Sequence, residues 1–161
     1  VETLQRRCVP QVRLIEGAAE TIRHLREMGY RLSIISNAAY GPFLRWTLAH
    51  FELLDYFEEV VVSADVGIRK PDFEIFRLTL DRLGLAPQET VYIGDDFVKD
   101  IRPAKALGMR AIWLPPGARN DVDPEQATVP DAVIDRLHQI PNLARQWQNQ
   151  AAGPAISNNR P

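Results

Sequence analysis

The stretch from Val91 to Asp100 limits the folds open to this chain more than any other part of it. Three apolar residues run directly into Gly94, and carboxylates follow at positions 95, 96 and 100. A short run that is apolar on both faces is typical of a buried strand in a parallel sheet. Ligands of open α/β sheets bind beyond the carboxyl ends of the strands, where a glycine lets the backbone approach them closely. The stretch therefore predicts a strand that ends at a ligand site.

The acids of this stretch indicate which ligand to expect. Asp95, Asp96 and Asp100 place three carboxylates within six positions. Such carboxylates repel one another unless a cation lies among them, and oxygen ligands suit a hard ion. The sequence therefore predicts a Mg²⁺ site. The alternative is a surface turn whose acids are solvated, and the stretch alone does not decide between the two.

Helix patterns and strand patterns alternate along the rest of the chain. Apolar residues recur at helical spacing from Ala18 to Met28, and Gly29 follows where helices often end. Asp72 and Asp100 are predicted to cap the third and fourth helices. The alternation predicts an α/β fold, a Rossmann-like parallel sheet with flanking helices. Helices are expected over residues 17–28, 43–50, 73–83, 101–107 and 143–148, and strands over 31–35, 59–63, 91–93, 111–114 and 132–134.

One domain is predicted over residues 14–150. Residues 1–13 show no clear period and are expected to be a linker or the end of a cap, whereas residues 151–161 hold few apolar side chains and are expected to be disordered. Residues 64–69 and 118–130 are expected to be loops. The net charge of −2 gives no reason to expect nucleic acid or an anionic membrane as a partner. The single cysteine excludes an internal disulfide, so we expect a cytoplasmic protein.

Polar side chains of complementary chemistry follow three of the predicted strands. Ser36 ends one strand, Lys70 follows the next by a loop, and Asp95 ends the third. Because the carboxyl ends of parallel strands share one edge, we expect these side chains to lie close together. A hydroxyl, a fixed cation and a metal-binding acid pair suit phosphoryl transfer, where catalysis is mostly positioning and charge stabilisation. Each residue also has a simpler interpretation. Ser36 could only end a strand, Lys70 could be an exposed loop cation, and Asp100 could be only a helix cap.

Three segments of the chain, taken in order, resemble motifs of the haloacid dehalogenase (HAD) superfamily of hydrolases. They are Ile34–Asn37 (IISN), Val66–Asp72 (VGIRKPD) and Ile93–Asp100 (IGDDFVKD), and Ala104–Met109 (AKALGM) matches the helix and glycine that usually follow the last of them. Each is weak alone, but their order and spacing within residues 14–135 are specific. The resemblance implies a Mg²⁺-dependent phosphatase of a small phosphorylated metabolite. The acid pair after the glycine favours a phosphatase over a dehalogenase, which needs no Mg²⁺.

The resemblance also implies roles for individual residues. Ser36 would donate a hydrogen bond to the transferring phosphoryl group, and Asn37 would contact the substrate. Lys70 would stabilise the nucleophile and the charge of the phosphoryl group. The implied Mg²⁺ ligands, direct or through water, are Asp95, Asp100 and Asp96, the last with a second interpretation as a contact of its own loop backbone.

The first motif of the family has no match in this sequence. It is an Asp-x-Asp pair after a hydrophobic strand, and the 35 residues before Ser36 contain no Asp. In the family it carries the nucleophile on the central strand of a sheet ordered 5-4-1-2-3. Asp121 and Asp123 have the spacing but lie in a polar stretch, so we reject them. We therefore expect this chain to be the C-terminal portion of a HAD-type hydrolase, without nucleophile or cap and inactive by itself.

A missing central strand has a structural consequence. The predicted strands at residues 31–36 and 91–94 would keep unpaired edges. We expect a marginally stable chain, direct pairing of these two strands, or recruitment of a partner, including self-association through the exposed edges. The alternative function is a non-catalytic HAD-like domain for binding or assembly. A response-regulator receiver domain shares the sheet and the acids, but nothing before Ser36 supplies its early acidic pair.

Overall fold

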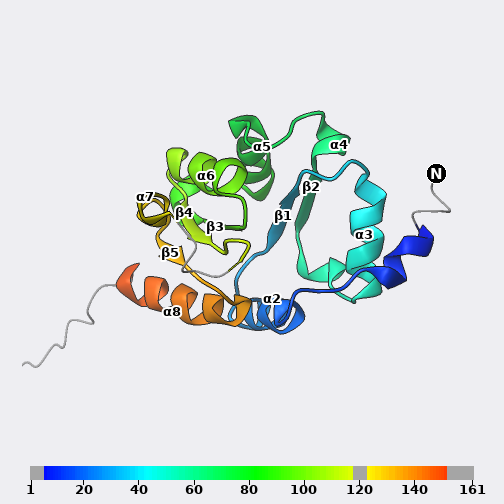
Figure 1. Ribbon diagram of the computed structural model, residues 1–161, viewed down its shortest axis with the longest axis horizontal. Coiled ribbons are helices and arrows are strands. Elements are labelled where there is room, and N and C mark those ends of the chain that lie inside the picture. The colour runs from blue at the N-terminus through cyan, green and yellow to red at the C-terminus, as the bar shows by residue number, and fades with distance from the viewer. Residues whose placement is uncertain (1–5, 118–122, 152–161) are drawn as a thin grey trace, which may run out of the picture.

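Two parallel sheets lie at the centre of the molecule (Figure 1). The computed structural model describes residues 6–117 and 123–151. One sheet has the order β1-β2 and the other β3-β4-β5, and every pair is parallel. Ser36 lies opposite Val62, and Gly94 lies opposite Trp113, so the carboxyl ends of neighbouring strands coincide. The strands are β1 (Ser33–Ser36), β2 (Glu59–Val62), β3 (Val91–Gly94), β4 (Arg110–Trp113) and β5 (Ala132–Val133).

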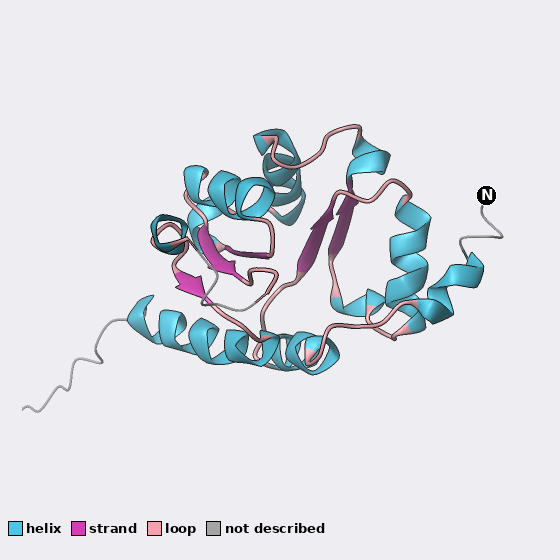
Figure 2. Ribbon diagram, in the orientation of Figure 1, coloured by secondary structure: helices cyan, strands magenta, loops and turns pink. Residues whose placement is uncertain are grey.

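Helices cover both faces of the sheets (Figure 2). Helices α5 and α6 lie on one face, and α2 and α8 lie on the other (Figure 1). Within the described residues, no helix is both long and apolar enough to span a membrane. The helices and helical turns are η1 (Val9–Gln11), α2 (Ala18–Glu27), α3 (Gly41–His50), η2 (Leu54–Tyr56), α4 (Ser63–Val66), α5 (Phe73–Leu83), η3 (Pro87–Glu89), the π-helical turn η4 (Phe97–Ile101), α6 (Arg102–Ala106), α7 (Pro124–Ala127), η6 (Leu137–Gln139) and α8 (Ile140–Ala151).

The two faces have separate hydrophobic cores. Alternate residues of a strand point to opposite faces, and β4 supplies both cores in this way. Trp113 packs with Phe76 of α5 on one side, whereas Ile112 packs with Leu25 of α2 and Ile140 of α8 on the other. The predicted α/β class with flanking helices is confirmed.

Helix α5 follows the sequence signals closely. The Asp72 carboxylate accepts a hydrogen bond from the Glu74 amide at 2.9 Å, and Gly84 ends the helix with a φ of 64°. Both termini match the prediction, because a short acidic cap and a left-handed glycine are strong local signals. The helix places Lys70, which lies in the loop before it, beside the sheet.

Other boundaries differ from the predictions. Asp100 was predicted to cap a helix over residues 101–107, and this is wrong. The cap is Asp96, whose carboxylate accepts from the amides of Val98 and Lys99, so the helical turn begins four residues earlier as η4. Short helices also occupy parts of both predicted loops, at α4 and α7. Residues 118–122 of the second predicted loop and residues 152–161 of the predicted tail lie outside the described residues.

A groove separates the two sheets, and we call it the central groove. Residues of β1 line one side and residues of β3 the other, around a volume of about 530 Å³. Within the described part of the chain β1 pairs only with β2, and β3 pairs only with β4, as predicted for the two edges. Direct pairing of β1 with β3 does not occur, so of the three predicted alternatives that one is wrong, and the other two stay predictions. The rings of Phe76 and Tyr92, with centroids 5.0 Å apart, line the groove on the α5 side.

Candidate active site

Lys70 forms a buried ion pair at the carboxyl edge of the central groove. Its Nζ atom lies 2.6 Å from Oδ1 of Asp100, and the two side chains are only 12% and 3% exposed. Tyr92 of β3 completes a triangle with its hydroxyl, which lies 3.1 Å from Lys70 Nζ and 3.1 Å from Asp100 Oδ1. A buried ion pair is stable only when the remaining hydrogen-bonding groups of both partners are satisfied. The Tyr92 hydroxyl accepts one hydrogen bond from Lys70 and donates one to Asp100.

Both carboxylate oxygens of Asp100 accept hydrogen bonds in this arrangement. The Asp96 amide donates to Asp100 Oδ2 at 3.2 Å, so both carboxylate oxygens have donors. Burial, reinforced by the negative charge of Asp100, raises the pKa of Tyr92 far above its ordinary value. Tyr92 therefore remains a neutral hydroxyl that can donate to Asp100 and accept from Lys70.

Asn37 fixes the backbone of Lys70. Its Nδ2 atom donates to the Lys70 carbonyl at 2.9 Å, and its Oδ1 atom accepts from the Lys70 amide at 2.8 Å. Asn37 directly follows Ser36, the last residue of β1. The two hydrogen bonds thus connect the end of β1 to the loop that carries the lysine. The contact of Asn37 with a substrate stays a prediction.

Asp95 and Asp96 make different contacts. Asp96 caps η4 and also pairs with Lys99, and the hydrogen bond from Lys99 holds the pKa of Asp96 below its ordinary value. Its carboxylate is therefore engaged with its own loop, the second of its two sequence interpretations. Asp95 is exposed, and its carbonyl accepts a hydrogen bond from Trp113 Nε1 at 2.9 Å. Asp95 lines the central groove beside Asp100.

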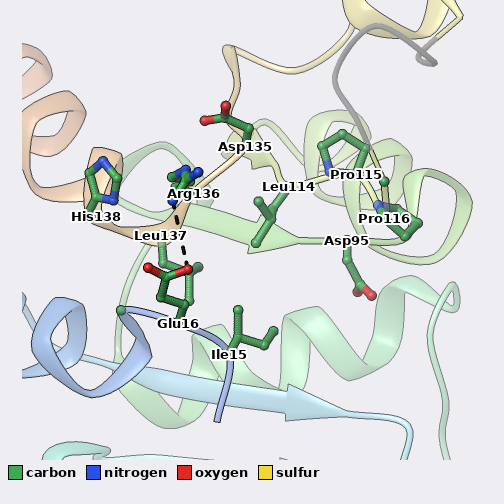
Figure 3. A pocket seen from close by; sticks show the side chains of 12 residues that line it. Ile15, Glu16, Asp95, Leu114, Pro115, Pro116, Asp135, Arg136, Leu137 and His138 are labelled. Carbon is green, nitrogen blue, oxygen red and sulfur yellow. Dashed lines mark ion pairs between the residues drawn. The ribbon is translucent and has the colours of Figure 1, made fainter.

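A second hollow begins on the other side of Asp95, and we call it the side pocket (Figure 3). It has a volume of about 560 Å³. Arg136 extends toward Glu16 across it, with 3.8 Å between the charged groups. Its wall is formed by residues 15–17, the loop at 114–117 after β4, and residues 135–138. No local sequence pattern marks these three segments as a site, because only the folded chain brings them together.

The residues present are compatible with a Mg²⁺ ion. The described residues contain no group of three or more acidic, histidine or cysteine ligands that could hold a metal. Mg²⁺ is usually bound by one or two carboxylates together with water and substrate phosphate. Asp95 is exposed at the edge, and from the described residues Asp100 Oδ2 accepts only the 3.2 Å bond given above, which leaves it a lone pair. Two carboxylates completed by water therefore fit the ion.

Comparisons with known proteins agree with the fold and the motifs. The family profile for haloacid dehalogenase-like hydrolases matches residues 1–114. A glyceraldehyde 3-phosphate phosphatase of Methanopyrus kandleri is 35% identical over 131 residues, which cover 78% of this chain and 54% of that protein. A phosphoserine phosphatase of Thermus thermophilus is 35% identical over 127 residues, 79% of this chain and 49% of that protein. This chain thus spans about half the length of the curated relatives that it matches.

A solved structure gives the same result. The crystal structure of a HAD phosphatase from Thermococcus onnurineus superposes with a TM-score of 0.76 at 31% sequence identity. The match covers 89% of this chain and 63% of that one.

Proposed function

Because this chain belongs to the haloacid dehalogenase-like hydrolase family, we propose that it is part of a Mg²⁺-dependent phosphatase that acts on a small phosphorylated metabolite. The observation that carries the proposal is the buried pair of Lys70 and Asp100, 2.6 Å apart and beside Asp95 at one edge of the central groove. A fixed cation next to two carboxylates suits a reaction in which negative charge must be held and positioned.

Each residue of the edge has a distinct task in this proposal. Lys70 stabilises the negative charge on the phosphoryl oxygens, and its ammonium is already oriented by Asp100 and Tyr92. Ser36, at the last position of β1, donates its hydroxyl to a phosphoryl oxygen. Asp95 and Asp100 hold Mg²⁺. When bound, the ion neutralises charge on the phosphate that is transferred.

We infer that the central groove accepts a further strand, and that this strand carries the nucleophilic aspartate. The edges of β1 and β3 that face the groove are unpaired within the described residues, and each strand is four residues long. Val91 and Ile93 of β3 are 39% and 36% exposed, whereas strands of parallel sheets are usually buried on both faces. A parallel strand of similar length would bury them and place its carboxyl end beside Lys70. The 161 residues by themselves are then inactive.

The side pocket supports a small substrate. Its volume of about 560 Å³ lies within the range of pockets for small ligands, and Asp95 borders both it and the central groove. A phosphate held near Asp95 would leave the rest of the substrate beside Arg136 and His138. The relatives named above provide two substrates to try first, glyceraldehyde 3-phosphate and phosphoserine.

The test is phosphate release from a panel of phosphomonoesters by the protein that carries this chain, with and without Mg²⁺. The 161-residue chain is assayed in parallel and should show no activity. Replacing Lys70 by methionine should lower kcat about a hundredfold or more, because a fixed donor to the phosphoryl charge is lost. Lys105→Met is the matched control, since Lys105 of α6 pairs with Asp131, the residue before β5, away from the edge. Undiminished activity of Lys70→Met would contradict the proposal.

A further inference from the structure

Tyr92 is the one side chain of β3 that reaches into the ion pair. Its neighbours Val91 and Ile93 are apolar, and its own ring packs against Phe76. We propose that the Tyr92 hydroxyl is a positioning group for the reaction: it holds the ammonium of Lys70 in one orientation against Asp100. The kinetic part of this inference rests on the proposed function, whereas the geometric part does not.

Lys70 needs such a group because a lysine side chain is flexible. Its four-carbon stem carries a rotating ammonium with three donors. Asp100 Oδ1 accepts one of these protons at 2.6 Å, and the Tyr92 hydroxyl accepts a second at 3.1 Å. Two fixed acceptors determine the direction of the third N–H. A phosphoryl oxygen or a nucleophilic carboxylate then meets a donor whose direction is already set.

Asp100 benefits from the same hydroxyl. The Tyr92 proton is donated to Asp100 Oδ1 at 3.1 Å, the oxygen that also accepts from Lys70. The three atoms form a closed triangle in which each contact limits the movement of the other two. Asp100 is 2% exposed, so water cannot replace a lost donor without rearrangement.

Packing alone does not account for a tyrosine at this position. A phenylalanine would supply the same ring, with its centroid 5.0 Å from that of Phe76, and would bury no hydroxyl. The Lys70 ammonium lies 5.7 Å from the Tyr92 ring centroid, a contact that phenylalanine would also keep. The Tyr92→Phe variant therefore removes the two hydroxyl contacts and nothing else.

The first experiment measures the position of Lys70 without relying on activity. The protein is treated with a small amount of acetic anhydride, and acetylation of each lysine is measured by peptide mass spectrometry. In Tyr92→Phe, Lys70 should be acetylated about tenfold faster, as expected for a lost hydrogen bond to a charged group. Lys105, paired with Asp131 at 2.7 Å, serves as the internal reference. Unchanged acetylation of Lys70 would overturn the proposal.

The second experiment separates positioning from substrate contact. In the protein that carries this chain, Tyr92→Phe should lower kcat about tenfold and leave KM within twofold. Tyr30→Phe is the matched control, because it removes a tyrosine hydroxyl that bonds the Ala144 carbonyl between α2 and α8. A raised KM with unchanged kcat would overturn the proposal in favour of direct substrate contact. If the unmodified protein releases no phosphate, the proposed function fails, and Lys70 acetylation still decides this inference.

Discussion

Lys70 is held at its backbone and at its ammonium by side chains from two different parts of the sheet edge. Asn37 binds its backbone from the end of β1, while Tyr92 and Asp100 bind its ammonium from β3 and the turn that follows. The residue therefore spans the carboxyl edge of the central groove. A change at either end should alter catalysis through Lys70 rather than through loss of a contact to the substrate.

Asn37→Asp tests the backbone end. The aspartate can still accept from the Lys70 amide, but its second oxygen would face the Lys70 carbonyl, which is also an acceptor. We expect a loss of about 1–3 kcal/mol in the free energy of unfolding, as for an unsatisfied buried group, together with a lower kcat at similar KM. Thermal melts and steady-state kinetics measure the two effects. Asn142→Asp, at an exposed site of α8, is the control, and a rise in KM alone would support the predicted substrate contact of Asn37 instead.

Gly94→Ala tests the close approach between β3 and Asp100. A Cβ atom at position 94 would overlap Cβ of Asp100 and lie 2.7 Å from its Cγ. We expect Asp100 to move, which lowers stability by about 1–3 kcal/mol and disrupts the Lys70 pair. Gly84→Ala has open space but a φ of 64°, so it shows the cost of backbone strain alone. Activity retained in Gly94→Ala would show that Asp100 tolerates displacement.

The elements differ in how well the sequence predicts them. Both ends of α5 are predicted correctly, because its cap and its terminal glycine act within one turn of the helix. The turn after β3 is harder, because Asp96 and Asp100 both have the chemistry of a helix cap. Only tertiary structure selects Asp96: the ammonium of Lys70, 30 residues away in sequence, pairs with Asp100. The same reason explains why Tyr92 escaped prediction as a site residue.

Helix α6 and the start of β5 are joined by an ion pair whose contribution depends on pH. Burial by itself raises the pKa of Asp131, but hydrogen bonds from Lys105 and the Ala111 amide outweigh it and keep that pKa below its ordinary value. A lowered folded-state pKa stabilises the fold above the unfolded-state pKa of about 3.9, and this contribution is lost as the pH falls through the folded-state value.

Asp131→Asn should therefore lower the free energy of unfolding near pH 7 by about 0.5 kcal/mol, since the side chain is partly exposed. The difference from the unmodified chain should begin to shrink as the pH falls below about 4, where Asp131 of the unfolded chain becomes protonated, and should continue to shrink until the lowered folded-state pKa is passed. Urea melts at several pH values measure it. Asp55→Asn, an exposed acid at η2, is the control. An equal difference at pH 7 and pH 3 would show that the ion pair contributes nothing.

At the scale of the whole molecule, the sequence predicts the elements and their pairing better than the spaces between the two sheets and their flanking segments. Strand order, parallel pairing and the edge with Lys70, Asp95 and Asp100 follow from local patterns and from motif order. The width of the central groove and the existence of the side pocket do not, because they depend on how helices of both faces hold the sheets apart. Arg136 and Glu16 meet across 120 residues of sequence, and no local signal in either segment indicates that contact.

The central groove leads to a prediction about association. Unpaired strand edges with exposed apolar side chains are templates for pairing with another chain. We therefore expect the 161-residue chain to self-associate with rising concentration in sedimentation velocity, and to melt at low temperature. Ile93→Lys should shift the chain toward the monomer, because a charged side chain on the edge of β3 opposes strand addition.

Val129→Lys is the matched control for this last experiment. Val129 is 37% exposed, close to the 36% of Ile93, but it lies outside the strands that border the groove. If association arises from general hydrophobicity, both substitutions should reduce it equally. If it arises from strand pairing in the groove, only Ile93→Lys should reduce it. A chain that stays monomeric at all concentrations and melts cooperatively at high temperature would show that the two edges need no partner strand.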